Sequence, residues 1–178
     1  MKLSKRSIAF AAPIAAVCLL VGCATAAKPE AMVAEKVAVA HRSSSDVSVV
    51  VAGGKETSAA GASQISNDAF GQALRDSIKN SELFSTVSDN GGRYKLTAFI
   101  GKVDQPMMGF SMTVKMEVTY TLADTNSNKS VWTKNVASEY TAKASAAFAG
   151  VERLRLANEG AAKANIQQAL TEMAALQL

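Results

Sequence analysis

The stretch MTVKMEVTYTL, residues 112–122, decides the fold. Its apolar side chains stand at every second position, and Thr, Lys and Glu fill the positions between them. Side chains of a β-strand point alternately to the two faces of a sheet, so the pattern predicts a strand with one packed face and one face in water.

The sequence around this strand supplies partners for it. Two segments have apolar residues at helical spacing, one over 66–80 and one over about 151–176. Their order along the chain, β-α-β-β-β-α, predicts an α+β fold: a two-layer sandwich of a mainly antiparallel sheet of about four strands with two helices on one face. The further segments with strand composition are 46–52, 94–103 and 131–140.

Composition limits the chemistry that the chain can perform. It has 178 residues, 48% of them apolar and 19% charged, which predicts a folded domain. A single His disfavours most His-based metal centres and triads. The formal charge of +4 falls to +1 without the first 22 residues, because 16 of the 19 basic residues then remain against 15 acidic ones. The concentrated basic footprint of a nucleic-acid binder is missing, so no nucleic-acid partner is expected.

Residues 1–22 have the architecture of an export signal. A short basic region is followed by the apolar run 8–21, which is shorter than the roughly 20 residues that span a bilayer. The run ends in Leu20-Val21-Gly22-Cys23, which resembles the lipobox of bacterial lipoproteins. An ordinary secretory peptide that carries a Cys by chance is the alternative.

The lipobox resemblance implies cleavage between Gly22 and Cys23 and a covalent lipid on Cys23. Ala24 is not a retention signal, which implies sorting to the outer membrane of a Gram-negative host, with the domain on its periplasmic face. The other cysteine, Cys18, lies in the signal, so the mature chain would have neither a free thiol nor a disulfide. About 155 residues can still bury a sufficient core.

Residues 23–45 are predicted to be a lipidated Cys followed by a flexible tether, and residues 46–178 to be the periplasmic domain. The tether, 23–45, is rich in Ala, Lys, Glu and Ser, and its apolar residues follow neither a helical nor a strand period. As a coil it would span about 26 Å. His41 in this segment is expected to be solvated.

The order of elements behind a lipobox resembles small accessory lipoproteins of the Gram-negative envelope, the YajG-like group and its structural relatives. The likeness lies in three stretches, which are 83–96 with its Gly-rich turn, 118–132 with its Val-Thr-Tyr-Thr-Leu run, and 150–166 in the last helix. It implies the fold and the compartment, and a scaffold or assembly factor in place of an enzyme.

A search for catalytic residues leaves few candidates. No Ser-x-x-Lys or Gly-x-Ser-x-Gly pattern stands at a strand-to-helix turn, and zinc ligands at usable spacing and phosphate-binding glycine loops are missing. We therefore expect no catalytic residue, no metal and no cofactor besides the lipid on Cys23. A hydrolase with a carboxylate pair is the alternative; its candidate acids are Asp104, Glu117, Asp124 and Glu139.

The segment Gln105–Met112 joins two predicted strands, yet it is apolar where a hairpin loop is normally polar. Methionine is adaptable and common on binding surfaces. We predict that Met107, Met108 and Phe110 form a contact patch for a partner protein or the membrane surface. The alternatives are that these side chains fold over the open end of the core, or that Met107 and Met108 bind copper(I) with Met112.

Together these features predict a non-enzymatic outer-membrane lipoprotein that serves as an interaction or accessory subunit of an envelope assembly. It would be held to the membrane by its lipid and would bind an envelope protein or further copies of itself, through a strand edge or the polar sheet face. The alternatives are a module for a small hydrophobic ligand or a glycan and a ring-forming subunit of an export channel.

Overall fold

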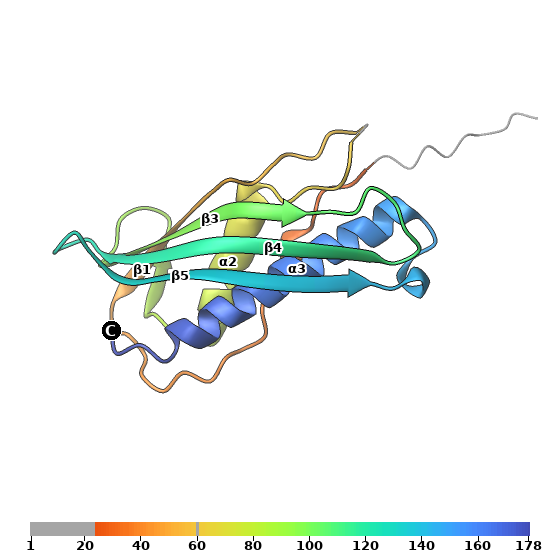
Figure 1. Cartoon of the computed structure of the whole chain (residues 1–178). Helices are drawn as coiled ribbons and strands as arrows, with labels where there is room; N and C mark the ends of the chain where they lie inside the picture. Colours follow the sequence, from red (N-terminus) through yellow and green to blue (C-terminus); the bar gives the residue numbers. More distant parts are fainter. Residues whose placement is uncertain (1–23, 60) are drawn as a thin grey trace, which may run out of the picture.

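The computed structural model describes residues 24–59 and 61–178. A five-stranded sheet lies in front of two main helices, which confirms the predicted two-layer α+β sandwich (Figure 1). The elements, in chain order, are α1 (Pro29–Met32), β1 (Asp46–Ala52), α2 (Asn67–Ser81), β2 (Thr86–Ser88), β3 (Tyr94–Asp104), β4 (Met112–Asp124), β5 (Lys129–Ala142), the 3-10 turn η1 (Ala144–Ala146) and α3 (Gly150–Met173).

The strand order is β2-β1-β3-β4-β5. The meander β3-β4-β5 is antiparallel, as predicted, whereas β1 is parallel to both β2 and β3. The sheet is therefore mixed and has one strand more than expected. Helix α2 lies in the connection between β1 and β3, and such a crossover brings the chain back in the same direction. Strand β2 has three residues, too few for an alternating pattern to show in the sequence.

The alternation over 112–122 is confirmed. Along β4 each of the apolar side chains is buried, and the residues between them face outward. Val118 lies opposite Ile100 of β3 and Val136 of β5, and all three are buried. Helix α3 covers this face closely: a Cβ on Gly160 would come within 2.3 Å of the Tyr140 ring. Glycine at position 160 therefore allows the helix to lie against β5.

The prediction of a flexible tether is wrong for the described part of 23–45. Met32 has no exposed surface, and Ala27, Ala34 and Val37 are also buried. We call residues 24–45 the strap, because they run over α2 and α3 as part of the domain. An irregular segment that buries isolated side chains has no period, so the sequence pattern could not indicate this packing.

Backbone hydrogen bonds hold the strap in place. The amide of Lys28 donates to Glu159 Oε1 at 2.9 Å, and the amide of Ala34 donates to Ser77 Oγ at 2.9 Å. Glu159 is itself buried and paired with Arg155 on α3. The predicted signal peptide, 1–22, and Cys23 lie outside the described residues. Within the described residues, none of the helices is both long enough and apolar enough to cross a membrane.

Candidate functional site: an apolar tip formed by two loops

The β3–β4 loop presents three large apolar side chains to solvent. Met107 is 99% exposed, Met108 84% and Phe110 88%. This exposure rules out the alternative that they fold over the end of the core. The role of these three residues as a contact patch stays a prediction.

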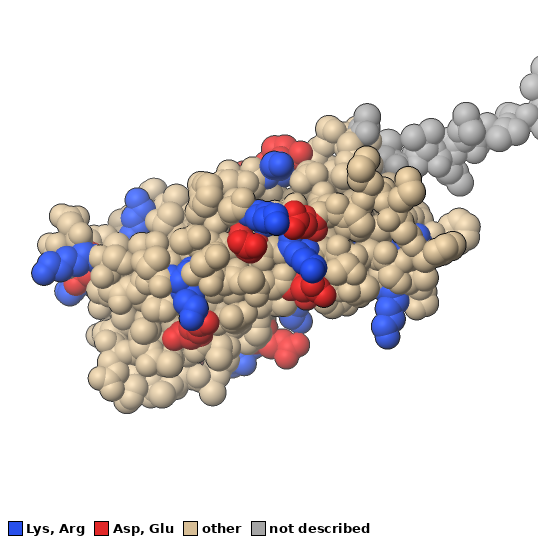
Figure 2. Space-filling model, viewed as in Figure 1, with Lys and Arg blue, Asp and Glu red and all other residues tan. Residues whose placement is uncertain are grey.

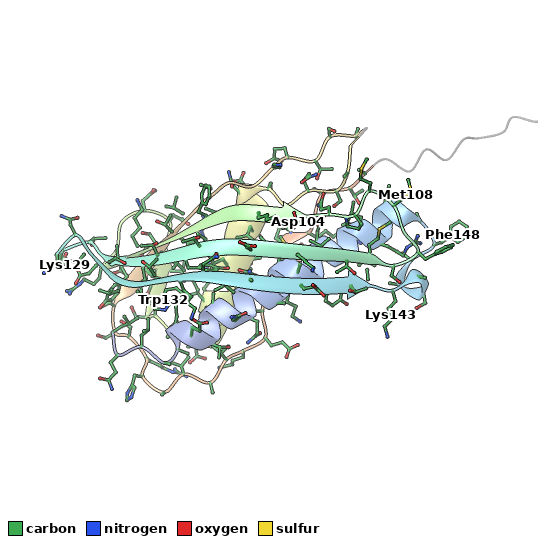
Figure 3. The ribbon with its side chains drawn as sticks, in the orientation of Figure 1. Asp104, Met108, Lys129, Trp132, Lys143 and Phe148 are labelled. Atoms are coloured by element: carbon green, nitrogen blue, oxygen red, sulfur yellow. The ribbon has the colours of Figure 1, made fainter. Side chains whose placement is uncertain are left out.

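A second loop adds to this surface. In the connection between η1 and α3, Phe148 is fully exposed, and Val151 in the first turn of α3 is partly exposed. Figure 3 shows Met108 and Phe148 at the same end of the molecule. We call the five residues Met107, Met108, Phe110, Phe148 and Val151 the apolar tip.

Arg153 joins the two loops. Its guanidinium Nη1 donates to the carbonyl oxygens of Ala147, at 2.7 Å, and Phe148, at 2.8 Å. Its Nη2 donates to the carbonyl oxygen of Gly109 at 3.4 Å. One side chain at the start of α3 therefore fixes the backbone of both loops while their apolar side chains stay free.

The base of the β3–β4 loop is held from beneath by buried amides. Gln105 Nε2 donates to Asn158 Oδ1 at 2.7 Å and to the carbonyl oxygen of Ser63 at 2.8 Å. The Nδ2 of Asn158 donates to the same carbonyl at 2.9 Å, and Asn158 is completely buried. The loop thus starts from a fixed point on α3 and on the 55–65 segment.

The strap reaches the same network. The amide of Ala27 donates to the carbonyl oxygen of Gln64 at 3.1 Å, and Gln64 Nε2 donates to Gln105 Oε1 at 3.2 Å. The described chain therefore begins beside the base of the apolar tip. Figure 1 shows this start, drawn in red, at the end of the sheet that carries the β3–β4 loop.

The apolar tip carries no charge of its own. Residues 105–114 and 144–151 contain neither acidic nor basic side chains. Figure 2 shows several charged side chains over the middle of this face, where Lys115 pairs with Glu139 at 3.3 Å and Lys102 pairs with Asp104 at 2.8 Å, and others at its two ends. The five side chains of the apolar tip can therefore lose water at no ionic cost of their own. The cation bonded to these loops, Arg153, is already held by the carbonyl oxygens of Ala147, Phe148 and Gly109.

The four candidate acids do not form an acid–base pair in the structure. Glu117 and Glu139 are exposed on the outer face of the sheet, and Asp104 is bonded to Lys102. The hydrogen bond from Arg93 holds the pKa of Asp124 below its usual range, whereas a general acid needs a raised pKa. Asp104, Asp124 and Glu139 are instead ion-pair partners of Lys102, Arg93 and Lys115.

The described residues also lack a cluster of three or more His, Cys, Asp or Glu that could hold a metal ion. His41 is exposed. Met112 is buried at the start of β4, 5% exposed, and so is not presented to solvent with Met107 and Met108 as the copper alternative required.

The sequence indicated three of the five residues of the apolar tip, Met107, Met108 and Phe110. The sequence pattern did not indicate Phe148, which lies in a run of small residues; the only signal for it was one large aromatic residue in that run. It also missed Arg153, whose role depends on carbonyl groups from two loops far apart in the sequence.

No protein-family model matches the sequence, and no curated protein sequence matches it. Solved structures do share the fold. A protein of the DUF330 family from Xanthomonas campestris matches with a TM-score of 0.65 and 12% identity, over 84% of this chain and 95% of that one.

Two further structures are similar at lower scores. A PelC dodecamer from Paraburkholderia phytofirmans matches with a TM-score of 0.51 and 14% identity, over 80% of this chain and 96% of that one. A candidate lipoprotein from Caulobacter crescentus matches with a TM-score of 0.50 and 16% identity, over 72% and 87% respectively. At these identities the likeness establishes the fold.

Proposed function

We propose that this chain is a non-enzymatic lipoprotein of the outer membrane, anchored on the periplasmic face by a lipid on Cys23, and an accessory subunit of an envelope assembly. The observation that supports the anchor is the position of the strap. Ala27, four residues after Cys23 of the lipobox, is already bonded to the domain, so the sequence that resembles a lipid attachment site leads directly into the fold.

The accessory role is supported by the apolar tip. Met107, Met108 and Phe110 are exposed apolar side chains, and such patches mark sites where a protein binds a partner protein or a membrane. Membership of the YajG-like group of accessory lipoproteins is part of the proposal. It is supported by the three stretches quoted above and by the fold shared with a candidate lipoprotein.

Lipid attachment is tested by metabolic labelling with an alkyne fatty acid in Gram-negative cells. We expect the wild-type chain to be labelled and to fractionate with outer membranes, and Cys23→Ser to lose the label. The matched control is Cys18→Ser, which removes the cysteine of the predicted signal and should keep the label. An unlabelled wild-type chain, or a label that survives Cys23→Ser, would contradict the proposal.

Sorting is tested by changing the residue after the lipidated Cys. If Ala24 directs the protein outward, Ala24→Asp should move the labelled protein to the inner-membrane fraction. Ala24→Ser is the matched control and should leave the protein in the outer membrane. An unchanged distribution of Ala24→Asp would remove the outer-membrane part of the proposal.

A ring-forming subunit is the second candidate. Strand β5 is an edge strand of 14 residues, and Val131 and Tyr140 on it are half-exposed. A long edge offers unpaired backbone groups to another chain. The PelC structure of the same fold is a dodecamer. The mass of the lipidated protein in mild detergent tests this candidate: a closed oligomer supports it, and a monomer contradicts it.

A further inference from the structure

We infer that the apolar tip inserts into the same bilayer that holds the lipid anchor, so that the domain has two contacts with one membrane. The inference rests on the proposed lipid on Cys23. It goes further because it names the bilayer as the partner of the apolar tip, adds Phe148 to the contact surface and fixes the orientation of the domain.

The first step is the short distance between anchor and domain. Ala27 is bonded to the carbonyl oxygen of Gln64, and the next fixed amide, that of Lys28, is bonded to Glu159. The chain from Cys23 to Ala27 covers four residues, which reach at most about 14 Å when extended. The domain therefore cannot stand away from the membrane, and the end that carries Ala27 must lie against it.

The second step is that this end is the apolar end. Gln64, which accepts the bond from Ala27, also donates to Gln105, two residues before Met107. Figures 1 and 3 agree: the described chain begins at the end where Met108 and Phe148 are labelled, whereas Lys129 and the C-terminus lie at the opposite end.

The third step is the chemistry of this end. Its two loops contain no charged residue, and their protruding side chains are Met and Phe, which gain free energy when they leave water for the acyl boundary. Lys143 is exposed at the same end (Figure 3). A cation there is favourable beside anionic lipid headgroups.

The test uses the full lipidated protein in vesicles of phosphatidylethanolamine and phosphatidylglycerol. With Cys18 removed in the signal and the Cys23 thiol lipidated, one introduced cysteine is the only free thiol. We would attach an environment-sensitive fluorophore at Met108→Cys or Phe148→Cys. The matched control is Ser127→Cys in the exposed turn between β4 and β5, at the opposite end.

We expect the probes at 108 and 148 to shift their emission to the blue and to be quenched by lipids that carry a nitroxide on the acyl chain. The probe at 127 should emit as in water. The opposite result is that the probes at positions 108 and 148 emit as in water while the protein floats with the vesicles. That result would support the lipid anchor and contradict the insertion of the apolar tip.

A second measurement tests whether a protein, in place of lipid, contacts the apolar tip. A photoreactive residue at position 108 in cells should give adducts with lipid. A dominant adduct with an envelope protein or with a second copy would assign the apolar tip to that partner and overturn the inference. A protein that carries no lipid and does not float would overturn the proposed function itself, which separates the two failures.

Discussion

The β4–β5 turn and the β3–β4 loop connect neighbouring strands at opposite ends of one sheet, and their side chains serve different purposes. In the turn, Asp124 Oδ1 accepts hydrogen bonds from the amides of Asn126 at 2.9 Å and Ser127 at 3.2 Å. Its other oxygen accepts from Arg93 at 2.6 Å. Polar side chains there stabilise the backbone of the turn itself.

In the β3–β4 loop the supporting bonds come from outside the protruding residues. Gln105 and Arg153 hold the backbone, and Met107, Met108 and Phe110 are left with no contact that the fold requires. The comparison teaches that apolar side chains without a structural role, kept on a fixed backbone, are available for binding.

The sharpest contrast lies between two methionines four residues apart in the chain: Met112, buried at the start of β4, and Met108, exposed in the loop. We expect Met112→Ala to lower the free energy of unfolding by about 2–4 kcal/mol, because it leaves a cavity. Met108→Ala should change it by less than about 0.5 kcal/mol. Urea unfolding of both variants checks this, and equal losses would refute the distinction.

Arg153→Ala tests whether the backbone of the apolar tip is held in place by the hydrogen bonds from Arg153. The variant loses the bonds to the carbonyls of Phe148 and Gly109, which we expect to cost about 1 kcal/mol of stability. Cleavage of the 105–111 loop by a non-specific protease should become faster. The control is Lys163→Ala, on the same helix as Arg153. It removes a surface pair with Glu35 of the strap and should leave the cleavage rate unchanged.

The polar turn should respond to pH, and the apolar tip should not. Because Arg93 lowers the pKa of Asp124 in the folded state, the ionised carboxylate adds stability above its unfolded pKa of about 3.9. That stability is lost as the pH falls through the lower, folded pKa. Asp124→Asn should therefore unfold at a lower temperature than the wild type near pH 7, and the two melting temperatures should converge in acid. A gap that persists unchanged at low pH would contradict this account.

The smallest effect on stability is expected from the triple change Met107→Ser, Met108→Ser and Phe110→Ser. These side chains make no buried contact, so the melting temperature should stay close to that of the wild type. A large drop would show that the apolar tip packs on the core in solution and would remove the contrast with the polar turn.

The sequence predicted those parts of the fold that depend on local periodicity. The alternation over 112–122 placed Val118 and Tyr120 in the core, and the helical spacing over 66–80 predicted α2, which Ser66 caps by accepting a hydrogen bond from the amide of Ala69. These features depend on neighbouring residues, so one sequence was sufficient to find them.

The features that the sequence did not predict depend on distant partners. The parallel pairing of β1 with β3 depends on where α2 crosses the sheet, and the strap depends on Met32 finding a place between α2 and α3. The apolar tip was predicted only on its β3–β4 side. Phe148 joins it because Arg153 brings a second loop alongside.

The strap also has a consequence for how the chain folds. Lys28 bonds to Glu159, 131 residues later in the chain, and Glu35 bonds to Gln167, 132 residues later. Such contacts have high sequence separation, so they form only after the chain has closed a very long loop. The strap therefore cannot make these bonds until α3 has formed. Removing either the strap or α3 should leave the other element without its hydrogen-bond partners.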